Sequence, residues 1–317
     1  MIKVGIIGCE GLRAIELVRI LINHPDVELQ WVCDAGHRGV SLDRLVPGIV
    51  GESSLTVSDE GKLADVDLVY LCLPRDKVET WLKRNPLPGE LKVVDMSGCH
   101  NLDQGVDGPW VYGMGEMQRR VLVHNAQWVT MPGVAAVASL LTLMPLARNQ
   151  MLKGPLSLHV TLGSAVLRDN RVEDGCLPPE TWIREQEQEV CRALKHCQAG
   201  YSEAVSMSVE PATEPRLLTV EARYKTSVAL EMLSRIYGQY YEDHNFVFLM
   251  NRPVTAADVV NTNKCLLTLD KDESDVVTVH AVMDGLLKAA AGNAVHAMNL
   301  MFELHERVGL TLKASGC

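Results

Sequence analysis

The first part of the chain alternates short apolar runs with segments of helical spacing. Four runs rich in Val, Ile and Leu cover residues 3–7, 27–33, 67–73 and 92–96. Short, continuous apolar runs of this kind are typical of strands buried on both faces of a parallel sheet. Between the first two runs, apolar residues recur at helical spacing from Ile15 to Leu21. This alternation predicts an α/β fold with a doubly wound parallel sheet.

The pattern changes from about Gly154. Segments expected to be strands cover residues 156–162, 217–225, 246–249, 264–269 and 276–282. Segments expected to be helices cover residues 179–198, 226–240 and 284–308. Strands separated by long connections and helices predict an α+β domain with a mostly antiparallel or mixed sheet. We therefore expect one domain over residues 1–148, completed by a C-terminal helix within 284–317, and a second over residues 149–283.

A small-residue segment from Thr130 to Leu146 lies near the expected domain boundary. Pro132 and Gly133 form its turn, and the residues behind them are almost all small or apolar. Proline and glycine together mark a turn, and the run that follows is apolar on every side. The segment therefore predicts a turn followed by a helix that is buried all round.

A glycine-containing turn follows the first predicted strand. Residues 8–14 read Gly-Cys-Glu-Gly-Leu-Arg-Ala and stand between that strand and the first predicted helix. In Rossmann-type folds such a turn lets the backbone approach a pyrophosphate, whose charge is met by the helix N-terminus. The alternative is a strand–helix turn without a ligand. The residues predicted to contact a dinucleotide are Gly8, Cys9, Glu10, Gly11, Leu12 and Arg13.

The nucleotide preference depends on residues after the second strand. Asp34 ends that strand, where an acidic residue holds the ribose diol of NAD and repels the 2′-phosphate of NADP. Arg38 stands nearby and would offset that repulsion, so NADP and NAD both stay open. The alternative role for Asp34 is to cap the next turn. Pro74 and Ser97 follow later strands, whose carboxyl ends face the ligand crevice in such sheets, and are also expected to line it.

Composition narrows the class of protein. The chain has 317 residues, 47% of them hydrophobic, and a net charge of −10, which disfavours a nucleic-acid partner. Its apolar runs are too short or interrupted to span a bilayer, and its N-terminus enters a strand pattern directly, without a signal peptide. The nine cysteines are scattered, with no Cys-x-x-Cys pair and no zinc spacing. We expect reduced thiols in a cytoplasmic protein and no metal.

Several motifs resemble one enzyme family. Besides the glycine turn, Tyr112-Gly113-Met114-Gly115-Glu116 and the segments 260–264 and 284–301 match its signatures. The chain is thereby identified as a member of the N-acetyl-γ-glutamyl-phosphate reductase family, related to aspartate-semialdehyde dehydrogenases. The resemblance implies an NADP-binding Rossmann domain, a substrate or dimerisation domain, a homodimer or homotetramer, and a place in arginine biosynthesis. Lys288, Glu116 and Asn299 fall on retained family positions, as scaffold or site lining, and Lys288 is expected near the cofactor.

The family's reactive groups are missing at the matching positions. The family's Asn-Pro-Gly-Cys turn, whose cysteine attacks the acyl phosphate, aligns with residues 131–134, so Val134 stands at the nucleophile position. The family's histidine positions fall on Gly175 and Leu177, and its arginine position falls on Asn101. Valine forms no thioester, and loss of a nucleophile costs on the order of 10⁶ in rate. The resemblance therefore implies impaired or absent activity in the family reaction.

Two other cysteines are weak candidates for a substitute nucleophile. Cys99 follows a predicted strand and neighbours His100, and a cysteine–histidine pair can activate a thiolate. Cys176 lies in the segment that aligns with the family histidines. Three hypotheses remain open: a divergent reductase that still binds the dinucleotide, a non-catalytic dinucleotide-binding or scaffold paralogue that acts through protein partners, and an active reductase that uses Cys99 or Cys176.

Overall fold

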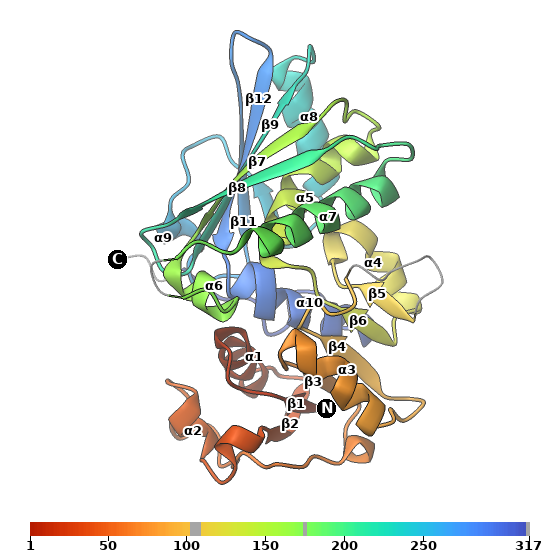
Figure 1. Ribbon diagram of the computed structural model, residues 1–317, viewed down its shortest axis with the longest axis vertical. Helices are drawn as coiled ribbons and strands as arrows, with labels where there is room; N and C mark the ends of the chain where they lie inside the picture. The colour runs from red at the N-terminus through yellow and green to blue at the C-terminus, as the bar shows by residue number, and fades with distance from the viewer. Residues whose placement is uncertain (102–108, 174–175, 315–317) are drawn as a thin grey trace. The chain divides into compact units, whose positions relative to one another are not determined.

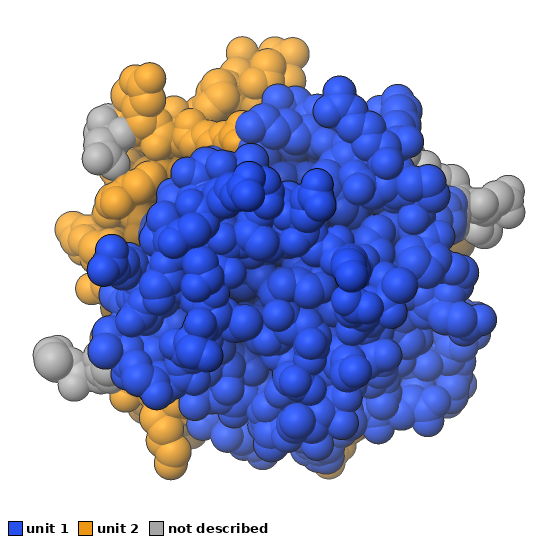
Figure 2. Space-filling view, turned by 90° about the horizontal axis from the view of Figure 1, so that it is seen from below, with its two compact units in different colours: residues 1–132, 290–311 blue, residues 133–289, 312–317 orange. Residues whose placement is uncertain are grey.

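The computed structural model describes residues 1–101, 109–173 and 176–314 (Figure 1). The chain divides into two compact units, which Figure 2 colours separately. Unit 1 comprises Met1–Pro132 and Ala290–Thr311, and unit 2 comprises Gly133–Ala289 and the chain from Leu312. Each unit contains its own six-stranded sheet.

The sheet of unit 1 is parallel throughout, in the order β2-β1-β3-β4-β6-β5 (Figure 1). Its strands are β1 Ile2–Ile7, β2 Val27–Cys33, β3 Leu68–Leu71, β4 Lys92–Asp95, β5 Trp110–Tyr112 and β6 Trp128–Thr130. The order reverses between β1 and β3, which makes the carboxyl ends of these two strands the switch point where open α/β sheets bind ligands. The predicted doubly wound parallel sheet is confirmed.

Helices complete unit 1. They are α1 Leu12–Ile22, η1 Ala35–His37, α2 Leu42–Leu45, η2 Leu63–Asp65, α3 Arg75–Arg84, α4 Gly115–His124 and α10 Gly292–Met301. Helix α1 buries Ala14, Leu17, Val18 and Leu21, as its spacing predicts. Every residue of α10 is buried, and α10 packs against α1 and α4. The end of the chain therefore contributes a central helix to unit 1.

The sheet of unit 2 is mixed, in the order β10-β11-β12-β9-β7-β8. Its strands are β7 Leu156–Leu162, β8 Val205–Pro211, β9 Leu217–Lys225, β10 Val247–Leu249, β11 Cys265–Lys271 and β12 Val276–Asp284. The pairs β7–β8 and β10–β11 are parallel, and the others are antiparallel. The predicted mixed sheet is confirmed. Strand β8 was not expected, although Val205, Met207 and Val209 alternate with exposed residues along it.

The helices of unit 2 are α5 Val134–Arg148, α6 Ser164–Asp169, α7 Glu180–Cys197, α8 Leu230–Tyr241 and α9 Ala256–Val259. The π-helical turn η3, Leu287–Ala291, begins in unit 2 and ends in unit 1. Helix α5 is buried from Val134 to Ala147, as expected, and packs against α7, β9 and β12. These contacts place α5 in unit 2, so the compact units divide after Pro132. The predicted boundary between a first domain ending at residue 148 and a second domain beginning at residue 149 stays a prediction.

Two tyrosines support a proline inside α5. Pro145 has no N–H to donate to the carbonyl oxygen of Leu141, which would therefore lack its helical partner. The hydroxyl of Tyr241 donates to that oxygen at 2.5 Å. The hydroxyl of Tyr237 donates to the carbonyl oxygen of Thr142 at 2.5 Å. Both bonds are buried and come from α8, so α8 satisfies the backbone groups around the proline.

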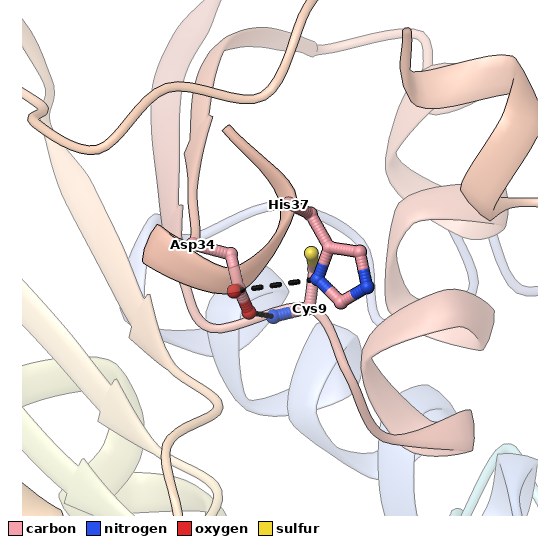
Figure 3. A group of neighbouring side chains, drawn as sticks. All are labelled: Cys9, Asp34 and His37. Atoms are coloured by element: carbon pink, nitrogen blue, oxygen red, sulfur yellow. Dashed lines mark hydrogen bonds and ion pairs between the residues drawn. The ribbon is translucent and has the colours of Figure 1, made fainter. Parts of the chain in front are cut away.

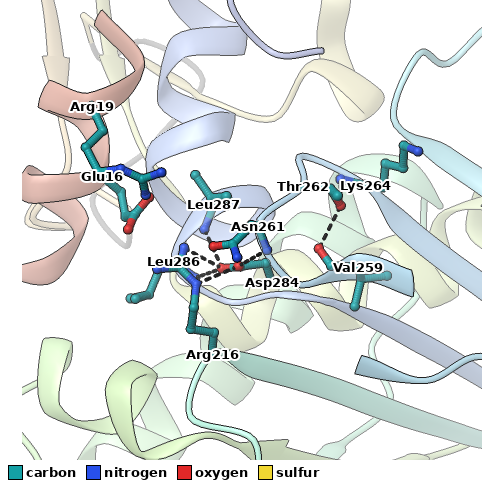
Figure 4. A network of polar contacts seen from close by, with 10 residues as sticks. All are labelled: Glu16, Arg19, Arg216, Val259, Asn261, Thr262, Lys264, Asp284, Leu286 and Leu287. Carbon is teal, nitrogen blue, oxygen red and sulfur yellow. Dashed lines mark hydrogen bonds and ion pairs between the residues drawn. The ribbon is translucent and has the colours of Figure 1, made fainter. Parts of the chain in front are cut away.

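The expected long helix over residues 284–308 is wrong at both ends. Asp284 belongs to β12, and its buried carboxylate accepts hydrogen bonds from the N–H groups of Leu286 and Leu287 and from Arg216 (Figure 4). The α-helix itself ends at Met301.

Two features end that helix. Glu303 has a φ of 55°, in the left-handed region, which stops the helical path. The side-chain amide of Asn299 then donates to the carbonyl oxygens of Glu306 at 3.1 Å and Val308 at 2.9 Å. The chain after Met301 therefore folds back on Asn299, which acts as scaffold. Among the described residues, no helix has the length and apolar character needed to cross a membrane.

Candidate functional site

The glycine turn lies at the switch point of the unit 1 sheet. Gly8 follows β1 with a φ of 87°, and its N–H donates to the carbonyl oxygen of Cys33 at 2.7 Å. A Cβ on Gly8 would lie 3.0 Å from the carbonyl carbon and oxygen of Cys72, which follows β3. Gly11 then caps the N-terminus of α1. Glycine at position 8 is thus required both by its φ and by the close approach of the strand ends.

The carboxylate of Asp34 holds this turn. It accepts hydrogen bonds from the N–H groups of Cys9 and Gly36, both at 2.9 Å, and lies 3.3 Å from Nδ1 of His37. Burial alone would raise the pKa of Asp34, but these hydrogen bonds together lower it below its usual value. The capping bond expected under the alternative role is therefore present, together with a second bond to the glycine turn.

Arg38 is engaged away from Asp34. Its guanidinium lies 2.6 Å from the carboxylate of Asp59, and its side chain is 71% exposed. A 2′-phosphate on a bound nucleotide would therefore compete with Asp59 for this arginine. Asp34 and Arg38 therefore act in opposite directions on the choice of nucleotide, and NADP and NAD both stay open.

The segment after β4 folds around a buried carboxylate. Asp95 is fully buried and accepts from the hydroxyl of Ser97 at 2.6 Å and from Nδ1 of His100 at 2.9 Å. Arg13, in the first turn of α1, donates to the carbonyl oxygen of Met96 at 2.9 Å. Pro74 caps α3 just after β3. Ser97 and Pro74 thus stand at strand ends of the same parallel sheet, the edge predicted to bind the dinucleotide, and Arg13 of α1 contacts that edge through Met96.

Asn101 and Cys99 have structural surroundings. The side-chain amide of Asn101 donates to the carbonyl oxygen of Met131 at 2.9 Å, and its oxygen accepts from the hydroxyl of Thr130 at 2.6 Å. Asn101 therefore holds the chain just after β6. Cys99 is 9% exposed and packs in an apolar cluster, while the ring of His100 stacks on Trp110 at 4.0 Å. The use of Cys99 as a nucleophile stays a prediction.

The first turn of α5 in unit 2 carries the position aligned with the family nucleophile. Val134 is the first residue of the helix and is 2% exposed. The N–H of Gly133 donates to the carboxyl group of Glu189 at 3.0 Å, and the N–H of Ala136 donates to the amide oxygen of Gln186 at 3.2 Å. Side chains of α7 thus occupy N–H groups that a helix N-terminus otherwise offers to an anion.

Sequence reasoning missed Gln186 and Glu189, which are three residues apart and therefore share one face of α7. Both are buried. Two polar residues at helical spacing on the buried face of an amphipathic helix could have indicated that these side chains bind a buried partner. A Cβ on Gly133 would lie 2.3 Å from the Gln186 oxygen, so the glycine allows this contact.

The remaining predicted positions differ in exposure. Leu177 is 53% exposed in the segment before α7, and Cys176 is also exposed. Gly175 lies outside the described residues. Lys288 is fully buried in the π-helical turn, with its Nζ 5.8 Å from the ring centroid of Phe246. Short π-helical segments are frequent at functional sites, so Lys288 stays a candidate for the cofactor site.

Comparison with known proteins defines the class of protein to which this chain belongs. Residues 3–125 match the family model "Semialdehyde dehydrogenase, NAD binding domain", and residues 185–285 match "Semialdehyde dehydrogenase, dimerisation domain". The fold resembles that of aspartate semialdehyde dehydrogenase II of Vibrio cholerae, with a TM-score of 0.74 and 12% identity, over 96% of this chain and 98% of that chain. An aspartate semialdehyde dehydrogenase of Candida albicans, crystallised with NADP, gives a TM-score of 0.71 at 12% identity, over 97% of this chain and 99% of that one. The fold and the matched domains are those of the semialdehyde dehydrogenases.

Full-length relatives narrow the family. The chain is 34% identical to the N-acetyl-gamma-glutamyl-phosphate reductase of Bacteroides fragilis (strain YCH46) and 31% identical to that of Christiangramia forsetii, each over 99% of both chains. The chain belongs to the N-acetyl-gamma-glutamyl-phosphate reductase family. The resemblance read from the sequence is confirmed, and so is the prediction of a nicotinamide dinucleotide, NADP or NAD, for its first domain.

Proposed function

We propose that this protein binds NADP or NAD at the Gly8–Arg13 turn and is impaired or inactive in the reaction of its family. The observation that carries the proposal is Val134 at the first position of α5. By resemblance, the family reaction starts there with attack of a thiolate on an acyl phosphate, after which the dinucleotide delivers hydride to the thioester. An isopropyl side chain supplies no electron pair for that attack.

The surroundings of Val134 support this proposal. An acidic side chain, Glu189, accepts from the N–H that precedes the helix, and Gln186 accepts from the N–H of Ala136. An anionic substrate group would have to displace the carboxyl group of Glu189 to reach these donors. A helix N-terminus stabilises negative charge only where its N–H groups stay available.

The aligned histidine and arginine positions also lack their reactive groups. Leu177 has no proton to exchange, and Asn101 is committed to Thr130 and Met131. Loss of one nucleophile costs on the order of 10⁶ in rate, and the groups of one catalytic unit act together. We therefore expect little residual turnover in the family reaction, the reductive dephosphorylation in arginine biosynthesis.

The glycine turn favours a retained dinucleotide over a purely structural role. Gly8 keeps the positive φ and close strand approach that allow a backbone to meet a pyrophosphate. The matched dimerisation domain supports the further proposal of a homodimer or homotetramer, and we propose the cytoplasm as its location. The second candidate function is a non-catalytic dinucleotide-binding or scaffold paralogue, which the same valine favours.

Thermal unfolding with NADPH, NADP, NADH or NAD tests the binding proposal. A ligand at about 100 times its Kd adds about 2.7 kcal/mol of stability, which shifts the midpoint by a few degrees. We expect a clear shift with at least one nucleotide and none in Gly8→Ala, the control in which the turn is displaced. No shift with any nucleotide up to millimolar concentration would contradict dinucleotide binding. A preference for NAD would assign Asp34 to the ribose diol.

A further inference from the structure

Three side chains with metal-binding atoms meet beside the glycine turn. Cys9 follows β1, Asp34 follows β2, and His37 ends the short 3-10 turn η1 (Figure 3). The sulfur of Cys9, a carboxylate oxygen of Asp34 and a ring nitrogen of His37 all lie within 4.8 Å of one another. All three residues belong to unit 1, and two adjacent parallel strands position them.

The separations are close to those of a tetrahedral metal site. Metal–ligand lengths of about 2.0–2.3 Å place two ligand atoms about 3.3–3.6 Å apart around a tetrahedral ion. The Asp34 oxygen and Nδ1 of His37 are 3.3 Å apart, which already meets this requirement. The sulfur lies within 4.8 Å of the other two ligand atoms and has to approach them by at most about 1.2 Å, which a rotation of the Cys9 side chain provides.

We propose that Cys9, Asp34 and His37 form a binding site for a zinc-class divalent metal ion. One thiolate, one imidazole and one carboxylate are ligands that Zn²⁺ and Co²⁺ accept, and three protein ligands leave a fourth position for water or another donor. The ion replaces the contact between His37 and Asp34. The thiol proton of Cys9 leaves to solvent, and the sulfur lone pair forms the bond to the metal.

The charges around the cluster favour a cation. A Cβ placed on Gly36 would lie 3.2 Å from an oxygen of Asp34 and 3.2 Å from an oxygen of Glu10, so both carboxylates border Gly36. A divalent ion bound to Asp34 offsets the repulsion between these two carboxylates. The side chain of His37 is 32% exposed, which gives the ion a route from solvent.

The site overlaps the turn that we propose for the dinucleotide. Asp34 cannot ligate a metal and hold a ribose diol with the same oxygens, so the ion and the nucleotide should weaken each other's binding. This consequence rests on the proposed function, whereas the metal site itself does not. A metal titration without nucleotide therefore separates the two proposals.

Cobalt titration of the metal-free protein, followed by absorption, tests the site. Tetrahedral Co²⁺ absorbs in the visible, and a thiolate ligand adds a charge-transfer band in the near ultraviolet. We expect one equivalent of Co²⁺ per chain with both signals. Cys9→Ser should abolish the charge-transfer band, and His37→Ala should keep that band but weaken binding by at least about tenfold, since even indirect partners of a metal contribute 10–100-fold.

The matched control is Cys176→Ser, which removes an exposed thiol in unit 2 and should leave the titration unchanged. Circular dichroism checks that each variant is folded. If Cys9→Ser is unstable, His37→Ala still tests the site, because the partly exposed His37 side chain can be removed without opening the core. Absence of a charge-transfer band in the parent protein would overturn the proposal. So would a band that survives in Cys9→Ser or disappears in Cys176→Ser.

Discussion

Replacement of Gly8 by alanine tests the close approach of the strand ends at the switch point. Gly8 has a φ of 87°, and a Cβ there would lie 3.0 Å from the backbone carbonyl of Cys72. Gly39 is a matched control, because its φ is 78° and a Cβ there would meet nothing within 4 Å. Left-handed backbone costs a non-glycine residue about 1–2 kcal/mol, and this cost applies to both variants. Crowding against backbone adds about 1–3 kcal/mol to Gly8→Ala alone.

Urea unfolding of the two variants measures the difference. We expect Gly8→Ala to lose about 2–5 kcal/mol and Gly39→Ala about 1–2 kcal/mol of unfolding free energy. Dinucleotide affinity should fall only in Gly8→Ala, since that side chain displaces the turn from β3. Equal losses in the two variants, within about 0.5 kcal/mol, would refute the close approach that we describe.

Three further predictions concern stability. Tyr241→Phe leaves the buried carbonyl of Leu141 without its donor and should cost about 1–3 kcal/mol in urea unfolding, whereas Tyr240→Phe should cost less; equal costs would contradict this role. Burial lowers the pKa of His24, so the unfolded chain binds more protons than the folded chain just below about pH 6.5. The unfolding free energy should therefore fall as pH drops from about 7.5 to about 5.5. His24→Gln should flatten this pH profile, and an unchanged slope in that variant would contradict the role of His24. Asp284→Ala removes the carboxylate that accepts hydrogen bonds from Arg216 and from three backbone N–H groups. It should lower the unfolding free energy by about 3–5 kcal/mol, measured as a lower urea unfolding midpoint.

The strands were predictable where local pattern decides structure. Strands β2, β7 and β9 have the bounds expected from their apolar or alternating residues. Strand β8 was not predicted, because its exposed residues are serine and glutamate and only three buried apolar residues alternate with them. The final helix was predicted too long at both ends, because Asp284 belongs to β12 and binds the N–H groups just after it, while the left-handed Glu303 and the bonds of Asn299 to the chain after Met301 end the helix.

The site was predictable only in part. The glycine turn and Asp34 were both predicted, because in Rossmann-type folds the residues that follow the first and second strands bind the dinucleotide. The contacts of Gln186 and Glu189 with α5 join residues about fifty positions apart, and no local spacing predicts them. The same holds for Cys9 and His37, which sequence spacing did not connect because two separate strands bring them together.

The most direct test of the central claim is the initial rate of NADPH formation from N-acetylglutamate semialdehyde, phosphate and NADP. With Val134 in place of a thiol, we expect a rate far below about 1 per second, at the limit of detection. The purified, folded protein should still show a thermal shift with a dinucleotide under the same conditions. A rate of about 1 per second or more would contradict the claim that this chain has lost the chemistry of its family.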